Sequence, residues 1–283
     1  MKMEREKFET FLVNINNSVM TVSFDYAPIN VLGTLMMKDL DKLCNFLESS
    51  NDIKVVIFQS NNPKFFIAHA DIDMLQYLST KEVDLKDVRV NDLARILDRV
   101  SKLPQVTIAK IEGYARGGGH EFALACDLRY AAIESAIFMQ MEVGMGILPC
   151  GGGSSRLARQ VGLGKALEII LSTKDFNAIE AEKYGSINKA IKADEIGLYV
   201  YDLAHRIAQF PKESITACKR TIHYSLNNSI EDTLKYETFQ LYQATSKTPA
   251  VKRFKYAADT NFQNNLNNQK NFETLLMNLQ NIK

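Results

Sequence analysis

Short apolar runs alternate with longer amphipathic segments through the first half of the chain, and this alternation restricts the fold more than any other feature. Val55-Val56-Ile57-Phe58 is apolar at four consecutive positions, which is typical of a strand buried on both faces. The predicted strands of this region are residues 52–59, 106–111 and 127–132, and the predicted helices are 32–49, 71–77, 88–102 and 118–125. The alternation predicts an α/β domain with mainly parallel strands.

The two ends of the chain differ from this middle part. Residues 8–15 and 19–24 alternate around Asn16-Asn17, which predicts a β-hairpin. After Gly151 only residues 186–191 still predict a strand, and the predicted helices are 154–161, 165–171, 178–184, 195–210, 212–226 and 229–247. The last residues, 260–283, are rich in Asn and Gln but keep leucines and phenylalanines at helical spacing, so we expect a docked helical tail.

Composition excludes several classes of protein. The 283 residues carry 34 basic and 33 acidic side chains, and this balance gives no support to binding of nucleic acid or of an anionic membrane. The charged N-terminus lacks the apolar core of a signal peptide, and no apolar run is long enough for a transmembrane helix. The four cysteines form no CxxC pair and are expected to be reduced, so the expected compartment is the cytoplasm.

A glycine-rich turn between a predicted strand and a predicted helix is the first candidate for chemistry. Gly117, Gly118 and Gly119 are consecutive, and Glu121 follows in the first turn of the helix. Glycines allow backbone N–H groups to approach a ligand, and a helix N-terminus presents unpaired donors, so this turn suits a negative charge that develops on oxygen. The spacing fits neither a P-loop nor a dinucleotide fingerprint. Taken alone, the triplet is explained better by close packing than by a function.

Three further segments add to the triplet. Residues 64–72 read K-F-F-I-A-H-A-D-I and run from a loop into a helix, so their backbone can supply a second donor. Glu142 is a carboxylate within the apolar stretch 138–149. The run G-G-G-S-S-R-L at 151–157 opens another helix.

With these segments in order, the chain resembles the enoyl-CoA hydratase/isomerase, or crotonase, superfamily. The segments that carry the resemblance are 27–32, 66–71, 117–121, 140–142 and 156–157, and the resemblance extends over about residues 8–225. It implies a spiral of ββα units forming two sheets, followed by helices. We therefore expect a spiral core with the acyl-CoA site over residues 1–210. A helical region over 211–283 would serve oligomerisation, as a trimer or a dimer of trimers, and would cover the active site.

The resemblance also implies roles for individual residues. The backbone N–H groups of Ala70 and Gly118 would form the oxyanion hole, and Glu121 and Glu142 would be the acid/base residues. Gly119 would allow close approach of the backbone. The residues expected to contact the substrate or its coenzyme A are Ile67, Ala68, His69, Asp71, Ile72, Gly117 and Gly119. Neither a metal nor a separate cofactor is expected, because coenzyme A is part of the substrate.

The expected activity is hydration of a 2-enoyl-CoA to a 3-hydroxyacyl-CoA. Two alternatives remain open: double-bond isomerisation, which needs chiefly Glu142, and acyl-CoA binding without catalysis on the same fold. The chain departs from the family by one extra residue between Glu121 and Glu142, placed in 131–135, and by Met141 in place of the usual proline. His120 is expected to pack or to make a surface hydrogen bond.

Overall fold

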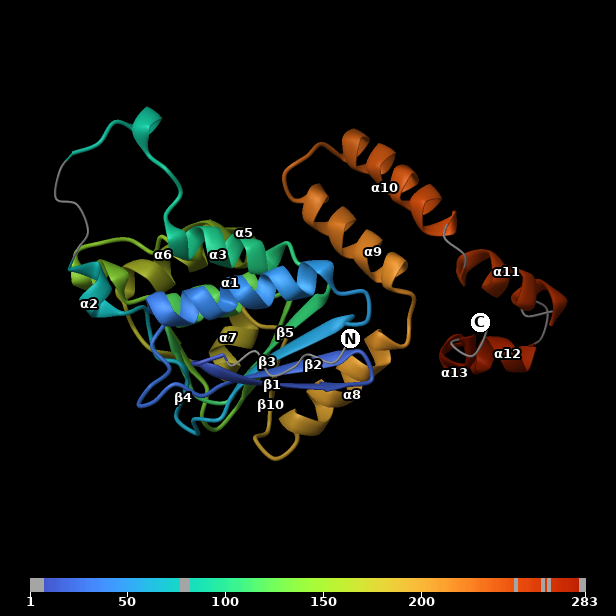
Figure 1. Ribbon diagram of the computed structural model, residues 1–283, viewed down its shortest axis with the longest axis horizontal. Helices are drawn as coiled ribbons and strands as arrows, with labels where there is room; N and C mark the ends of the chain where they lie inside the picture. The colour runs from blue at the N-terminus through green and yellow to red at the C-terminus, as the bar shows by residue number, and fades with distance from the viewer. Residues whose placement is uncertain (1–7, 77–81, 247–248, 261–262, 264–265, 280–283) are drawn as a thin grey trace.

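The computed structural model describes residues 8–279, except 77–81, 247–248, 261–262 and 264–265 (Figure 1). The strands are β1 (Phe11–Asn16), β2 (Val19–Phe24), β3 (Val55–Ser60), β4 (Phe65–Ile67), β5 (Val106–Ile111), β6 (Tyr114–Arg116), β7 (Leu128–Ala132), β8 (Ile137–Met139), β9 (Phe176–Asn177) and β10 (Lys189–Ile191). The helices are α1 (Thr34–Ser49), α2 (Ile72–Leu75), α3 (Asp92–Ser101), α4 (Gly118–Ala125), α5 (Gly153–Val161), α6 (Leu163–Ser172), α7 (Ala178–Tyr184), α8 (Ile196–Ala208), α9 (Lys212–Ser225), α10 (Ile230–Thr245), α11 (Pro249–Asp259), α12 (Leu266–Lys270) and α13 (Phe272–Asn278). Two 3₁₀ turns, η1 (Leu85–Asp87) and η2 (Glu142–Met145), complete the elements.

The strands form two sheets that the chain visits in turn. One sheet has the order β1-β2-β3-β5-β7-β10 and the other β4-β6-β8-β9. Strands β2, β3, β5, β7 and β10 pair in parallel, and so do β4, β6 and β8. Each pair β3–β4, β5–β6 and β7–β8 therefore gives its first strand to one sheet and its second strand to the other. This repetition produces the expected spiral of ββα units.

Strand β3 of the six-stranded sheet is buried on both faces along its apolar run, as that run predicts. Val55 and Ile57 pack on the side covered by α8, whereas Val56 and Phe58 belong to the larger core on the opposite side. Figure 1 shows α1 and α3 over one face of this sheet and α8 over the other. Successive side chains of a strand point to opposite faces, so an apolar run without alternation needs cover on both.

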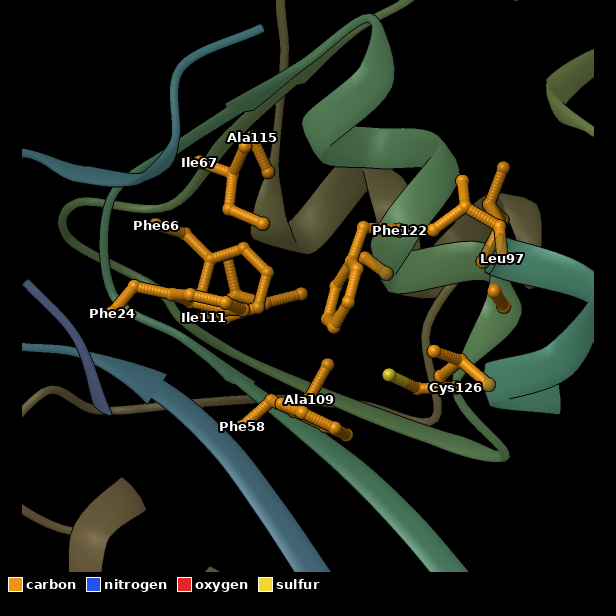
Figure 2. Close-up of a cluster of buried hydrophobic side chains, with 14 of the residues drawn as sticks. Phe24, Phe58, Phe66, Ile67, Leu97, Ala109, Ile111, Ala115, Phe122 and Cys126 are labelled. Atoms are coloured by element: carbon orange, nitrogen blue, oxygen red, sulfur yellow. The ribbon is translucent and has the colours of Figure 1, made fainter. Parts of the chain in front are cut away.

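A cluster of phenylalanines anchors the helix that begins at the glycine triplet. Phe122 of α4 lies edge-on to Phe24 and Phe58, with ring centroids 5.3 and 5.0 Å apart. Figure 2 shows its side chain pointing from α4 into the core. Burying a phenylalanine contributes about 1.5–3 kcal/mol. The residue that follows Glu121 therefore fixes the orientation of α4.

Most predicted elements are confirmed, and the exceptions have physical reasons. The bounds of β5, α4 and α7 are those predicted, but the hairpin turn lies at Asn17 and Ser18, whose φ angles are +47° and +65°, because Asn16 still belongs to β1. Strands β4, β6 and β8 have three residues each and are not predicted from the sequence. Strands this short carry no measurable periodicity. The predicted helix 71–77 is α2, and its last residue lies outside the described residues.

The helices after α8 lie to one side of the sheets (Figure 1). Helix α9 is attached to the core by Lys219, whose ammonium group lies 2.7 Å from Asp127 and donates to the carbonyl of Gln105 at 2.8 Å. The described tail is helical, as expected, but Phe272 is 41% exposed and Leu276 is 36% exposed. Among the described helices, none combines the length and apolar character that a transmembrane span requires.

Candidate active site

Two loops meet where β4 and β6 end. These strands are parallel neighbours, so the loop from β4 to α2 and the turn from β6 to α4 leave the same edge of their sheet. A Cβ atom added to Gly118 would lie 3.0 Å from the Cβ and 3.1 Å from the backbone nitrogen of Ala70. The structure therefore brings together the two residues predicted for the oxyanion hole.

The close approach depends on glycine at two of the three positions. Gly117 adopts φ +47°, a left-handed conformation that favours glycine. A Cβ atom on Gly119 would lie 2.0 Å from the carbonyl oxygen of Ile67, which is a backbone atom and cannot turn aside. Gly119 therefore allows α4 to pack closely against β4, and its role toward a ligand stays a prediction.

Both predicted backbone donors lack a local acceptor. The bridge between Leu32 and Ala70 uses the carbonyl of His69 and the N–H of Asp71, at 2.9 and 3.1 Å, so the N–H of Ala70 donates in none of the described backbone hydrogen bonds. Gly118 is the first residue of α4, where N–H groups have no helical acceptor. Two adjacent free donors can stabilise one oxygen that gains negative charge.

Glu121 is held in place by a second glycine-rich turn. The side chain is 2% exposed, and its Oε1 atom accepts the backbone N–H groups of Gly151 and Gly153 at 2.7 and 2.8 Å. Burial raises the pKa of this carboxyl, and the two N–H groups act in the opposite direction. From the sequence, the run 151–153 is predicted only to open a helix, and its contact with Glu121 is not predicted. The sequence feature that could have indicated this contact is that residues 151–153, like 117–119, form a glycine run at the start of a helix.

Glu142 faces the first glycine turn from the other side. It begins η2 and is 9% exposed, and a Cβ atom on Gly117 would lie 2.8 Å from its Oε1 atom. Its Oε2 atom is buried without a hydrogen-bond partner among the described residues. Burial raises the pKa of Glu142 to about 7, and the charge of Glu121 also raises it. A carboxyl with this pKa can hold or release a proton near neutral pH.

The extra residue between the two glutamates does not disturb this arrangement. Its predicted place, residues 131–135, covers the end of β7 and most of the turn to β8, and β8 still pairs with β6 so that Met139 lies opposite Arg116. An insertion in a turn leaves the strands in register. Glu142 therefore reaches the glycine turn despite the longer spacing.

The other residues expected at the substrate line the β4–α2 loop. Ile67 and Ala68 are buried, and the His69 ring lies 2.8 Å from the carbonyl oxygen of Ala70. Asp71 accepts the N–H of Asp73 and caps α2, and Ile72 is 41% exposed. Their contacts with an acyl-CoA stay predictions.

Several neighbouring polar residues have structural partners. Arg116 forms a two-point ion pair with Asp175 and lies over the ring of Tyr114, which is half-buried. Asp127 pairs with Lys219 and His223. The described residues include no group of three His, Cys, Asp or Glu side chains that could hold a metal ion.

A spiral of ββα units over two sheets, with a backbone donor pair at one edge, is the crotonase fold. The sequence model of the enoyl-CoA hydratase/isomerase family matches residues 14–270, and the chain belongs to this family. It is 31% identical over 210 residues to the short-chain-enoyl-CoA hydratase of Clostridium acetobutylicum, covering 74% of this chain and 79% of that one. It is 35% identical over 180 residues to the human mitochondrial enoyl-CoA hydratase domain-containing protein 2, covering 64% and 60%. The crystal structure of enoyl-CoA hydratase from Bacillus anthracis has a TM-score of 0.81 and 25% identity, covering 89% and 97%.

Proposed function

We propose that the protein adds water to a 2-enoyl-CoA thioester and releases a 3-hydroxyacyl-CoA. The observation that carries this proposal is the pair of buried carboxyls beside the two free N–H donors. One carboxyl is held by backbone amides and the other has an unpartnered oxygen. The hydratase names of its relatives support the same activity.

The oxyanion pair would act on the thioester carbonyl. When the oxygen of water bonds to C3, the π electrons of the double bond move toward the carbonyl and place negative charge on its oxygen. The N–H groups of Ala70 and Gly118 would donate to that oxygen. Loss of one such donor typically costs about 10²–10³ in rate.

The two glutamates would divide the proton transfers. Glu121 has its Oε1 atom fixed by two N–H donors, which favour the ionised form, so it is suited to orient the water and take its proton. Glu142, with a pKa near 7, is suited to give a proton to C2. The product leaves the proton on Glu121, and its transfer to Glu142 through solvent restores the starting state. The active form of the enzyme therefore carries one proton on the pair of glutamates, both in hydration and in the reverse reaction.

The remaining expectations belong to this proposal. The β4–α2 loop would bind the adenine end of coenzyme A through its backbone, and no further cofactor would be needed. The helices from α9 onward would form contacts between subunits of a trimer or a dimer of trimers and would cover the active site. Their exposed apolar residues, which include Phe239, Leu241 and Phe254, are consistent with burial against another subunit.

The experiment follows the absorbance of the enoyl-thioester band of crotonyl-CoA with wild type, Glu121→Gln and Glu142→Gln. We expect loss of absorbance in wild type and a rate reduced about 10²–10⁴-fold in each variant, because each removes one acid/base group. Glu112→Gln is the control, since this glutamate pairs with Lys110 at 2.7 Å and its side chain is 37% exposed.

The outcomes discriminate between the three candidate activities. Unchanged absorbance with wild type contradicts hydration of this substrate. Conversion of a 3-enoyl-CoA that survives Glu121→Gln but not Glu142→Gln identifies an isomerase, because isomerisation moves one proton with one carboxyl. Binding of acyl-CoA without turnover of either enoyl thioester identifies a binding protein.

A further inference from the structure

One buried hydrogen bond joins the two elements that carry the glutamates. The Nε2 atom of Gln140 lies 3.0 Å from the Nδ1 atom of His120. His120 directly precedes Glu121 on α4, and Gln140 precedes Glu142 by two residues after β8. The bond therefore connects α4 to the segment between β8 and η2.

The surroundings of the pair keep the His120 ring uncharged. Both side chains are fully buried, and the His120 ring packs against Phe138 and Phe176 with centroids 5.4 and 5.6 Å away. Burial lowers the pKa of His120 to about 3, so the ring is neutral at neutral pH. A neutral ring that accepts the Gln140 amide at Nδ1 carries its proton on Nε2. The predicted packing of His120 is confirmed, and its alternative of a surface hydrogen bond is wrong.

The hydrogen bond between His120 and Gln140 does not stabilise the fold enough to explain why two polar residues are buried here. The Nε2 atom of His120 and the Oε1 atom of Gln140 are buried without a hydrogen-bond partner in the described part of the chain. Each unpaired buried polar group costs about 1–3 kcal/mol, whereas apolar side chains of the same shape would leave none unpaired. One hydrogen bond contributes about 0.5–1.5 kcal/mol, which does not offset that cost.

Gln140 also lies beside the backbone clamp of Glu121. A Cβ atom added to Gly153 would lie 3.1 Å from the Nε2 atom of Gln140 and 2.9 Å from the Oε1 atom of Glu121. The glutamine amide and the glutamate carboxylate thus face the same point of the 151–153 turn. The pair is adjacent to α4, to η2 and to the turn that clamps Glu121.

We propose that His120 and Gln140 are positioning residues, whose hydrogen bond fixes the carboxyl of Glu142 relative to that of Glu121. The proposal rests on the proposed hydration, which needs both carboxyls aligned on one water. Neither residue is assigned contact with the substrate. Loss of the bond would misalign the two carboxyls while leaving the oxyanion donors and the coenzyme A loop in place.

The test uses His120→Phe, Gln140→Met and the double variant, which replace each side chain with an apolar one of similar shape and remove the bond. We expect kcat for crotonyl-CoA to fall about 10–100-fold, because misplacement by about 1 Å costs about 10²-fold, with KM changed less than about twofold. The double variant should be no slower than either single variant, since each removes the same bond. His120→Asn, which keeps an acceptor for the Gln140 amide, should recover part of kcat.

Gln105→Met is the matched control for the loss of a buried glutamine. Gln105 is also fully buried, donates one hydrogen bond to the carbonyl of Leu47 at 2.7 Å and leaves its Oε1 atom unpartnered, but it lies between α3 and β5, away from both glutamates. This variant should lose stability without a change in kcat. Equal losses of kcat in Gln105→Met and Gln140→Met, or unchanged kcat in both variants of the pair, would overturn the positioning role.

A second readout separates this proposal from the proposed activity. The pKa of Glu142, followed by NMR of ¹³C-labelled glutamate, should fall in Gln140→Met, because a loosened carboxyl gains water and moves away from the charge of Glu121. If the pKa of Glu142 falls in Gln140→Met but the wild-type protein hydrates no enoyl-CoA, the proposed hydratase activity is refuted and the positioning role of His120 and Gln140 is supported. If the pKa of Glu142 is unchanged in Gln140→Met and this variant hydrates crotonyl-CoA at the wild-type rate, the positioning role is refuted and the hydratase activity is supported.

Discussion

The glycine that contacts β4 provides the sharpest test of how this fold makes its oxyanion site. In Gly119→Ala, the new Cβ atom would lie 2.0 Å from the carbonyl oxygen of Ile67 and 2.9 Å from its carbonyl carbon. Both are backbone atoms, so relief requires α4 to move away from β4 by about 1 Å. Overpacking of this kind costs about 1–3 kcal/mol of stability.

The same movement carries Gly118 away from Ala70. A displacement of about 1 Å at the reacting centre costs about 10²-fold in rate, which corresponds to about 2.7 kcal/mol at 1.36 kcal/mol for each factor of ten. We therefore expect kcat/KM for crotonyl-CoA to fall about 100-fold in Gly119→Ala, measured by loss of the enoyl-thioester absorbance. The melting temperature, recorded by circular dichroism, should fall as well.

The matched control is Gly197→Ala. Gly197 lies in the first turn of α8, and a Cβ atom there would meet nothing within 4 Å. Alanine is favoured over glycine in a helix by up to about 1 kcal/mol, so this variant should be equally active and at least as stable. Wild-type kcat/KM in Gly119→Ala would refute the reasoning, because it would mean that the spacing between α4 and β4 does not set the donor geometry.

Two further predictions follow from the buried charges. The value of kcat/KM should fall as the pH rises through about 7, because Glu142 loses its proton there and the pair of glutamates no longer carries the one proton that the reaction needs. A pH profile that is flat from 6 to 8 would contradict this assignment. Asp127→Ala should lower the free energy of unfolding by about 3–5 kcal/mol, because it leaves the ammonium group of Lys219, 8% exposed, without its partner. Denaturation by urea measures the second effect, and Asp92→Ala, which removes an exposed pair with Arg95, should change it by less than about 1 kcal/mol.

The layers of the fold and the place of one glutamate could be predicted from local properties of the sequence. An apolar run of four residues in β3 requires cover on both faces of its strand, and a glycine triplet between a strand and a helix requires a close turn. Both are local properties, since they depend on the period of the side chains and on the absence of Cβ atoms. Glu121 lies two residues after the triplet, so its position in the first turn of α4 could be predicted.

The positions of Glu142 and of the glycine turn that holds Glu121 depend on contacts between distant segments, which form only when the chain folds. Gly151 and Gly153 are 30 and 32 residues from Glu121, and their hydrogen bonds to it depend on the stacking of α5 against α4. The strands that bring Glu142 to the site have three residues each, too few to show a period. The raised pKa of Glu142 comes from burial and from the nearby charge of Glu121, and both exist only after the chain has folded.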